Sequence, residues 1–164
     1  VFADVGPFRP EVYGIGSDVE MWLRIVRRHP VAILDERLIR YRKGRHQWSA
    51  RYMHERTEPE AFFGVLDEYL GMDGWLEKLA PGDLTEYAFH RGDDATFRAA
   101  NLVRKGDAER ALALLRAYPF PWSTLRAGPR RRKLRNIALR TIIRAGIAMR
   151  ARQPLTFFLE RIGP

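Results

Sequence analysis

The chain has 164 residues, of which 46% are hydrophobic and 12% aromatic. This content is enough to bury a core in one domain or two small ones, and it excludes a disordered tail. Cysteine is absent, which excludes disulfides and thiolate metal sites and fits a reducing compartment. The net charge of +9 belongs to residues 126–164, where Glu160 is the one acid and the bases are Arg126, Arg130, Arg131, Arg132, Lys133, Arg135, Arg140, Arg144, Arg150, Arg152 and Arg161. Because the remainder is nearly neutral, nucleic-acid binding over the whole chain is disfavoured.

The first residue is Val1 and not Met, so we expect a piece of a longer chain with no visible targeting signal. Arg140, Arg144 and Arg150 interrupt the most apolar stretch, so no membrane-spanning helix is expected. The expected location is the cytoplasm, with peripheral contact at the inner face of the membrane as an extension of that expectation.

The first third of the chain predicts a loop, a helix and two strands. Residues 1–16 are rich in Gly and Pro, which favours an irregular loop. Residues 17–28 have apolar residues at helical spacing and end before Pro30, which predicts an amphipathic helix. Residues 31–35 and 38–42 are short β-rich runs and predict two strands. Together they predict the edge of an α/β sheet.

The middle of the chain, residues 53–125, predicts a helical extension. Helices are expected over 59–70 and, past Gly74, over 75–80. Residues 96–106 and 107–118 predict an αα-hairpin, with Gly106 as the stop of its first helix and Asp107 as the N-cap of its second. The hairpin resembles a single tetratricopeptide-like unit, but a solenoid needs about three repeats. An accessory packing element is therefore favoured.

The last segment, residues 126–164, predicts a basic amphipathic tail. A Pro- and Gly-containing linker precedes a helix expected over 131–152, which Pro154 should terminate. One side of that helix carries Leu134, Ile137, Ala138, Ile142 and Ala145, and another side carries Arg140 and Arg144. Residues 130–152 could lie on an anionic membrane surface, or form a solvated helix packed on the domain. The sequence leaves both open.

Residues 1–52 contain several short motifs that together match the pattern of one protein family. The residues are Gly6 and Phe8 in the loop, the acids Asp18 and Glu20, the helix residues Trp22, Leu23 and Arg24, and then Tyr41 and Arg42. In order and spacing they resemble the end of the GT-A domain in family 2 inverting glycosyltransferases. The resemblance implies a Rossmann-like α/β fold and transfer of a sugar from a nucleotide sugar to a glycan or lipid-linked acceptor hydroxyl. Two positions depart from the family pattern: Ser17, where Glu is common, and Gly44, where His is common.

By this resemblance Asp18 is the general base that deprotonates the acceptor. A sugar hydroxyl is a poor nucleophile until its proton is removed, and a positioned carboxylate can remove it. The same residues also fit a capping box, in which Ser17 and Glu20 close the helix start and Asp18 only complements the helix dipole. Glu20 and Trp22 are candidates to line the acceptor site, although a packing role in the core is favoured for Trp22. Arg24 is expected to be a helix-face or ion-pair residue and not a phosphate ligand.

A polar loop after the second predicted strand is the candidate for binding the donor diphosphate. Its residues Arg42, Arg45 and His46 could form charge-assisted hydrogen bonds with phosphate, or could be ordinary surface charges. No Asp-x-Asp pair or Gly-rich phosphate loop is present, and Asp93 and Asp94 are expected to begin a helix. By the resemblance, Mg²⁺ or Mn²⁺ is bound mainly by an N-terminal half that this piece lacks, so the piece alone should not transfer sugar.

No metal site is expected within these residues, because His29, His54 and His90 have no shared ligand spacing. The alternative to an enzyme is a non-enzymatic helical interaction module built on residues 96–118, with a basic tail that binds membrane or nucleic acid. No recognisable nucleic-acid motif supports nucleic acid as the partner of this tail.

Overall fold

The computed structural model describes residues 1–36, 38–40, 52, 55–126 and 130–162. Within these ranges the regular elements are helices, and no strand is formed. The predicted α/β Rossmann-like fold is therefore wrong for the part of the chain that the structure describes. Residues 31–36 and 38–40 adopt no regular structure, and the side chains of Ile33 and Ile39 are 91% and 85% exposed. Their β-branched composition favours an extended backbone, but a strand also needs a hydrogen-bonded neighbour, and no described segment supplies one.

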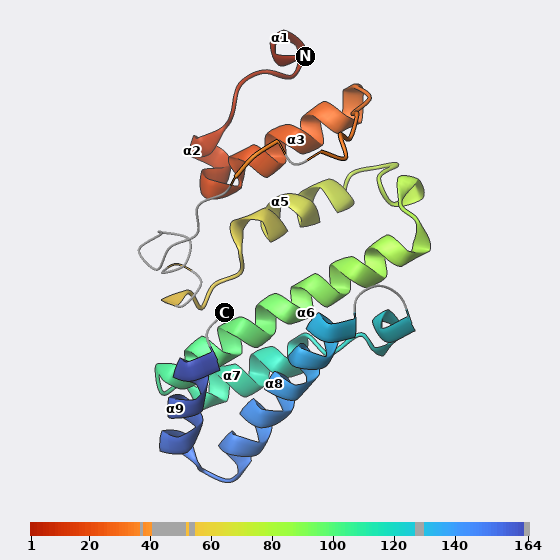
Figure 1. Ribbon diagram of the computed structural model, residues 1–164. Coiled ribbons are helices and arrows are strands. Elements are labelled where there is room, and N and C mark those ends of the chain that lie inside the picture. The colour runs from red at the N-terminus through yellow and green to blue at the C-terminus, as the bar shows by residue number, and fades with distance from the viewer. Residues whose placement is uncertain (37, 41–51, 53–54, 127–129, 163–164) are drawn as a thin grey trace. The chain divides into compact units, whose positions relative to one another are not determined.

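The chain divides into two compact units, which we describe separately. Unit 1 comprises residues 1–43 and 60–78, and unit 2 comprises residues 44–59 and 79–164. The helices of unit 1 are α1 (Phe2–Val5), α2 (Pro10–Tyr13), η1 (Gly14–Gly16), α3 (Ser17–Arg28), α5 (Ala61–Leu70) and η2 (Leu76–Lys78) (Figure 1). The predictions of a helix over 17–28 and of another ending at Leu70 are confirmed, whereas the loop predicted over 1–16 contains three short helical turns.

The core of unit 1 forms where one side of α3 packs on α5. Met21 of α3 and Phe63, Val65 and Tyr69 of α5 are at most 4% exposed, and Val5 of α1 is 5% exposed. The close approach has a sequence cause, since Gly16 at the start of α3 lies where a Cβ would meet Val65 at 3.3 Å. This packing buries the side of α3 that carries Met21 and leaves the opposite side exposed to solvent.

Unit 2 is built around one long helix. Its elements are α6 (Pro81–Arg104), α7 (Ala108–Ala117), η3 (Trp122–Arg126), α8 (Arg130–Ala148) and α9 (Arg152–Ile162), and Figure 1 shows α7 and α8 running beside α6. The αα-hairpin of α6 and α7 is confirmed. Gly106 ends α6 with φ of +85°, a conformation that favours glycine, and Asp107 accepts a hydrogen bond from the backbone N–H of Arg110 at 3.1 Å.

Two predicted helix boundaries in unit 2 are wrong. Helix α6 begins at Pro81, so Asp93 and Asp94 lie near its middle and do not start it. Pro154 does not end the helical tail, because it lies in the first turn of α9, where a missing N–H costs no intrahelical hydrogen bond. The apolar core of unit 2 lies among α6, α7, α8 and α9, with Ala99, Ala111, Leu115, Ile143, Leu155 and Leu159 at most 4% exposed.

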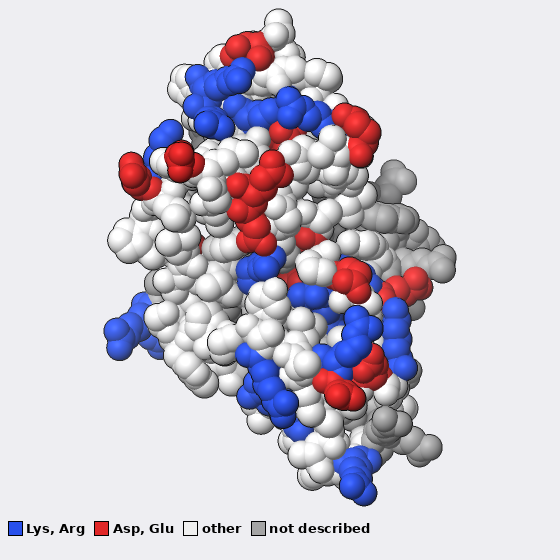
Figure 2. Space-filling view, turned by 180° about the vertical axis from the view of Figure 1, so that it is seen from behind, with Lys and Arg blue, Asp and Glu red and all other residues white. Residues whose placement is uncertain are grey.

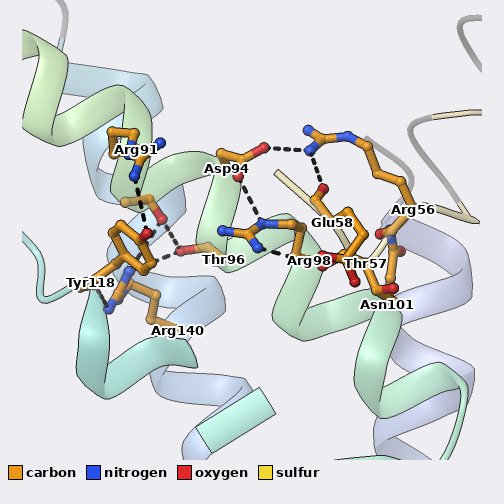
Figure 3. Close-up of polar contacts among 11 residues, drawn as sticks. Arg56, Thr57, Glu58, Arg91, Asp94, Thr96, Arg98, Asn101, Tyr118 and Arg140 are labelled. Atoms are coloured by element: carbon orange, nitrogen blue, oxygen red, sulfur yellow. Dashed lines mark hydrogen bonds and ion pairs between the residues drawn. The ribbon is translucent and has the colours of Figure 1, made fainter. Parts of the chain in front are cut away.

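A network of buried polar side chains accompanies this core (Figure 3). The Asp94 carboxylate pairs with Arg56 at 2.6 Å and with Arg98 at 2.8 Å, and all three side chains are at most 7% exposed. Asn101 donates to the backbone oxygen of Arg56 at 2.8 Å. Arg56 lies outside any long helix, so the network ties an irregular segment of unit 2 to α6. A buried carboxylate is tolerated here because two guanidinium groups compensate it.

Neither a membrane-spanning helix nor a metal-binding group is found in the described ranges. None of their helices combines the length and the apolar character needed to cross a bilayer. No three side chains of His, Asp or Glu in these ranges come together in a way that could hold a metal ion.

Candidate functional site

The residues singled out by the family resemblance are divided between two sides of α3. Asp18 and Trp22 are four residues apart, so they share one face of the helix, and both are exposed. Glu20 lies on the other side and is 1% exposed, against the core of unit 1. The helix therefore presents one carboxylate to solvent and withdraws the other.

Asp18 occupies the first turn of α3, which follows directly on η1. Its Oδ1 accepts a hydrogen bond from the N–H of Val19 at 2.8 Å. The predicted capping box is wrong, because α3 has no side-chain cap and Glu20 turns inward. Asp18 is thus held by a single short hydrogen bond, with its second oxygen on an exposed side chain.

Trp22 is 66% exposed, so the core position favoured for it from sequence is wrong. An exposed indole one turn after an exposed carboxylate gives an apolar face beside a proton acceptor. Sugar rings pack well on such a face, through their C–H groups, while their hydroxyls remain free to hydrogen-bond. Chemically, the pair could hold a hydroxylated ligand with one of its O–H groups near Asp18.

Glu20 is the centre of the ion pairs that hold α3 in unit 1. Its Oε1 lies 2.7 Å from Nε of Arg24 and 3.8 Å from Arg9, and it accepts a hydrogen bond from the hydroxyl of Tyr69 at 3.2 Å. Burial raises the pKa of Tyr69 to about 12, and the negative charge of Glu20 and the hydrogen bond to it act in the same direction. The phenol therefore stays protonated and remains a hydrogen-bond donor at neutral pH.

Of the two roles expected for Arg24, the structure shows the ion pair, and it adds a further role. Its guanidinium donates to the backbone oxygen of Val5 and, at 2.7 Å, to that of Pro7. These carbonyls flank Gly6, whose φ of +79° favours glycine and turns the loop toward α3. The loop and the helix of the sequence pattern are therefore in direct contact, because Arg24 of the helix binds the backbone on both sides of Gly6.

Sequence reasoning missed the residues that complete this arrangement. Tyr69 lies 49 positions after Glu20, and no local pattern pairs them. Asp4 was also missed, and its carboxylate contacts His29 at 2.8 Å and Arg28 at 3.5 Å. The basic end of α3 and an acid in the preceding loop were visible in the sequence, so this second pairing had a signal in charge complementarity.

The proposed donor loop is not part of the described structure. Arg42, Arg45 and His46 lie outside the described residues, as does His54. In unit 1, His29 contacts Asp4 at 2.8 Å, and in unit 2 the ring of His90 lies 5.7 Å from that of Phe89. The described candidate site is therefore Asp18 and Trp22, held from behind by Glu20 and Arg24.

Comparison of the sequence with protein-family models and with curated proteins, and of the structure with solved structures, gave no match.

Proposed function

We propose that this chain carries the acceptor-side helix of an inverting glycosyltransferase, with Asp18 as the general base. The observation that supports the proposal most directly is the exposed Asp18 carboxylate at the start of α3 with the exposed Trp22 ring one turn away. The proposal rests on this helix and on its resemblance to the family pattern. It does not include a sheet within this chain.

In the proposed reaction, Asp18 accepts the proton of an acceptor hydroxyl as that oxygen attacks the anomeric carbon of a nucleotide sugar. The new C–O bond forms as the bond from the anomeric carbon to the diphosphate oxygen breaks, and the nucleoside diphosphate leaves with the bonding electrons. Attack from the side opposite the leaving group inverts the anomeric centre. Trp22 would hold the acceptor ring so that its hydroxyl stays near the carboxylate, which lowers the entropic part of the barrier.

The buried side of α3 suits it for this role. A general base must be held within hydrogen-bond reach of the proton that it removes. Helix α3 is anchored at its first half by Glu20 and at its second half by the contacts of Arg24 with Val5 and Pro7. These side chains do not touch the acceptor in the proposal; they position the helix that carries Asp18.

The donor side remains an expectation from the resemblance. A nucleotide sugar would be bound chiefly by residues outside this chain, together with Mg²⁺ or Mn²⁺, whose chemistry is to neutralise charge on the leaving diphosphate. Arg42, Arg45 and His46 are proposed to contact that diphosphate.

The decisive experiment uses the protein that carries this chain together with its donor-binding part. Wild type and Asp18→Asn are compared for transfer from a panel of nucleotide sugars with Mg²⁺ or Mn²⁺, and nucleotide binding is measured by calorimetry. We expect kcat to fall by about a hundredfold or more in Asp18→Asn, since general base catalysis contributes roughly 10²–10⁴. Nucleotide affinity should not change.

Asp73→Asn is the matched control, because it removes the charge of another exposed carboxylate of unit 1. Equal activity of wild type and Asp18→Asn would refute the role of Asp18 as base. No binding of any nucleotide sugar would favour the alternative, a helical interaction module, to which the α6–α7 hairpin lends support. In that case Trp22→Ala and Asp18→Asn should leave partner binding unchanged, while changes on the exposed side of α7 should weaken it.

A further inference from the structure

Helix α8 buries three polar side chains and exposes part of its apolar ones, although its Ile143 lies in the core of unit 2. Lys133, Asn136 and Arg140 are its buried polar side chains, at 2%, 3% and 5% exposure. Leu134 and Met149, by contrast, are 55% and 71% exposed. The sequence pattern predicted an apolar side for this helix, but the structure turns much of that side away from unit 2.

The buried polar side chains of α8 form hydrogen bonds and ion pairs within unit 2. Lys133 pairs with Glu86 and donates to the backbone oxygen of Thr124 at 2.8 Å. Asn136 donates to Asp93 at 2.7 Å, and Arg132 reaches the same carboxylate at 2.6 Å.

Arg140 donates to four acceptors: the backbone oxygens of Gly92, Leu115 and Tyr118 and the hydroxyl of Thr96. Burial, and to a lesser extent the charge of Arg144, lowers its pKa to about 10, which still leaves it charged at neutral pH. These contacts fix the rotation of α8 about its axis, so its outer face is determined by the structure.

The outer face of α8 is a mostly apolar spine that continues to Met149 just past the helix end, with arginines near both ends. Arg144 is also exposed, but it donates to the backbone oxygen of Leu115 at 3.1 Å. Leu134, Ala138, Thr141, Ala145 and Met149 follow one another at spacings of three or four residues, and all are exposed. Arg130, Arg131 and Arg135 are exposed beside its N-terminal end, and Arg150 follows its C-terminal end. Residues 130–150 contain no acid. We call the spine and these four arginines the α8 face.

The residues of the α8 face carry positive charge and no negative charge. On the side of the molecule drawn in Figure 2, acidic and basic side chains are interspersed. A face of one charge sign favours an anionic partner. A nucleic acid would pair with the arginines but would offer no apolar surface to the spine between them. An anionic bilayer satisfies both, because apolar side chains enter the acyl boundary while arginines remain among the headgroups.

We propose that the α8 face binds the surface of an anionic lipid bilayer, with α8 parallel to the membrane plane. The apolar spine is modest, with two leucine-sized side chains and several small residues. Binding should therefore depend strongly on the arginines and be reversible. The inference concerns unit 2 and does not depend on the proposed glycosyl transfer.

Vesicle sedimentation of the 164-residue chain tests the proposal. Vesicles of neutral phosphatidylcholine are compared with vesicles that contain phosphatidylglycerol, at low and at physiological salt. We expect binding to the anionic vesicles alone, weakened by salt. Arg131→Glu combined with Arg135→Glu should weaken it at least about twentyfold, since each basic side chain near the headgroups contributes roughly a fivefold factor.

The matched control is Arg110→Glu combined with Arg116→Glu, which changes the same net charge on exposed positions of α7. For the apolar spine, Leu134→Ser is compared with Leu84→Ser, an exposed leucine of α6. The α8 variants should weaken binding and the α6 and α7 variants should not, while circular dichroism verifies that all remain helical.

Three results would overturn the proposal. Equal binding to neutral and anionic vesicles, or none to either, would refute the bilayer as partner. Equal weakening by the α7 control would show that net charge alone is responsible. Binding to a DNA duplex or self-association, lost in Leu134→Ser and without vesicle binding, would assign the α8 face to another occupant.

Discussion

Replacing Arg24 with Met should destabilise unit 1 while leaving unit 2 intact. The substitution removes the ion pair with Glu20, whose side chain is 1% exposed, and the two hydrogen bonds to the carbonyls of Val5 and Pro7. Breaking one partner of a buried pair costs about 3–5 kcal/mol, because the other charge stays buried. Arg9, at 3.8 Å from Glu20, can compensate in part, so we expect a loss near the lower limit, about 3 kcal/mol.

Such a loss is large for unit 1, since a folded unit of its size is stabilised by about 3–9 kcal/mol. Hydrogen exchange followed by mass spectrometry measures each unit separately, because peptides from α3 and α5 report on unit 1 and peptides from α6 and α7 report on unit 2. Exchange should accelerate by about a hundredfold in the first set, as a 3 kcal/mol loss implies, and should not change in the second.

The double variant Glu20→Gln with Arg24→Met is the control for this reasoning. It removes both charges, so the buried carboxylate that accounts for the loss is gone, and protection should recover in large part. If the double variant were as unprotected as Arg24→Met, the cost would lie in the loop contacts and not in the charge of Glu20. If Arg24→Met exchanged like wild type, the described pairing would not stabilise unit 1.

Three further predictions follow from other positions. Because the folded state raises the pKa of Tyr69 from 10.0 to about 12, its stabilising contribution is complete below pH 10 and is lost as pH rises toward 12; denaturant titrations should show wild type losing up to about 3 kcal/mol more than Tyr69→Phe over that interval, and equal losses would contradict it. Arg140→Met removes four hydrogen bonds and should cost unit 2 at least about 3 kcal/mol in urea unfolding, whereas a cost near zero would mean that the bonds are not formed. Gly146→Ala places a Cβ 2.8 Å from Leu155, so the free energy of unfolding should fall by about 1 kcal/mol, and the melting temperature with it, despite the better helix propensity of alanine. Adding Leu155→Val should restore the melting temperature. A higher melting temperature in Gly146→Ala alone would show that Leu155 moves freely.

The helices that could be predicted are those whose causes are local. Helix α3 has an amphipathic pattern and a proline soon after its end, and the hairpin of α6 and α7 has Gly106 and Asp107 at its turn. Spacing and capping residues act within a few positions, so the sequence displays them directly. The ion pair of Glu20 with Arg24 belongs to the same class, since it joins adjacent turns of one helix.

The features that sequence reasoning misjudged depend on distant partners. Lys133 and Asn136 are buried because Glu86 and Asp93 of α6 receive them, 47 and 43 positions away. A periodicity argument assigns charged and polar residues to the solvent side, so it does not predict that these two are buried. Similarly, residues 31–35 have the composition of a strand, but composition cannot provide the neighbour that a strand requires.

For the candidate site, the sequence identified Asp18 through a pattern but could not assign sides to Glu20 and Trp22. The buried Glu20 has a distant partner, Tyr69 of α5, which donates a hydrogen bond to it, besides its ion pairs with Arg24 and Arg9. With the carboxylate of Glu20 facing the core, Trp22 faces the opposite side, because residues two positions apart are separated by about 200° around the helix axis.

The division of the chain into units is discontinuous. Residues 1–43 and 60–78 belong to one unit, and residues 44–59 and 79–164 belong to the other, so the polypeptide passes between them three times. No single cut therefore releases either unit whole: a fragment that starts at residue 79 lacks Arg56, and with it one of the two cations that neutralise Asp94. Expressing the units separately would require deleting residues 44–59 from between the two segments of unit 1 and joining them, through a new linker, to the start of α6.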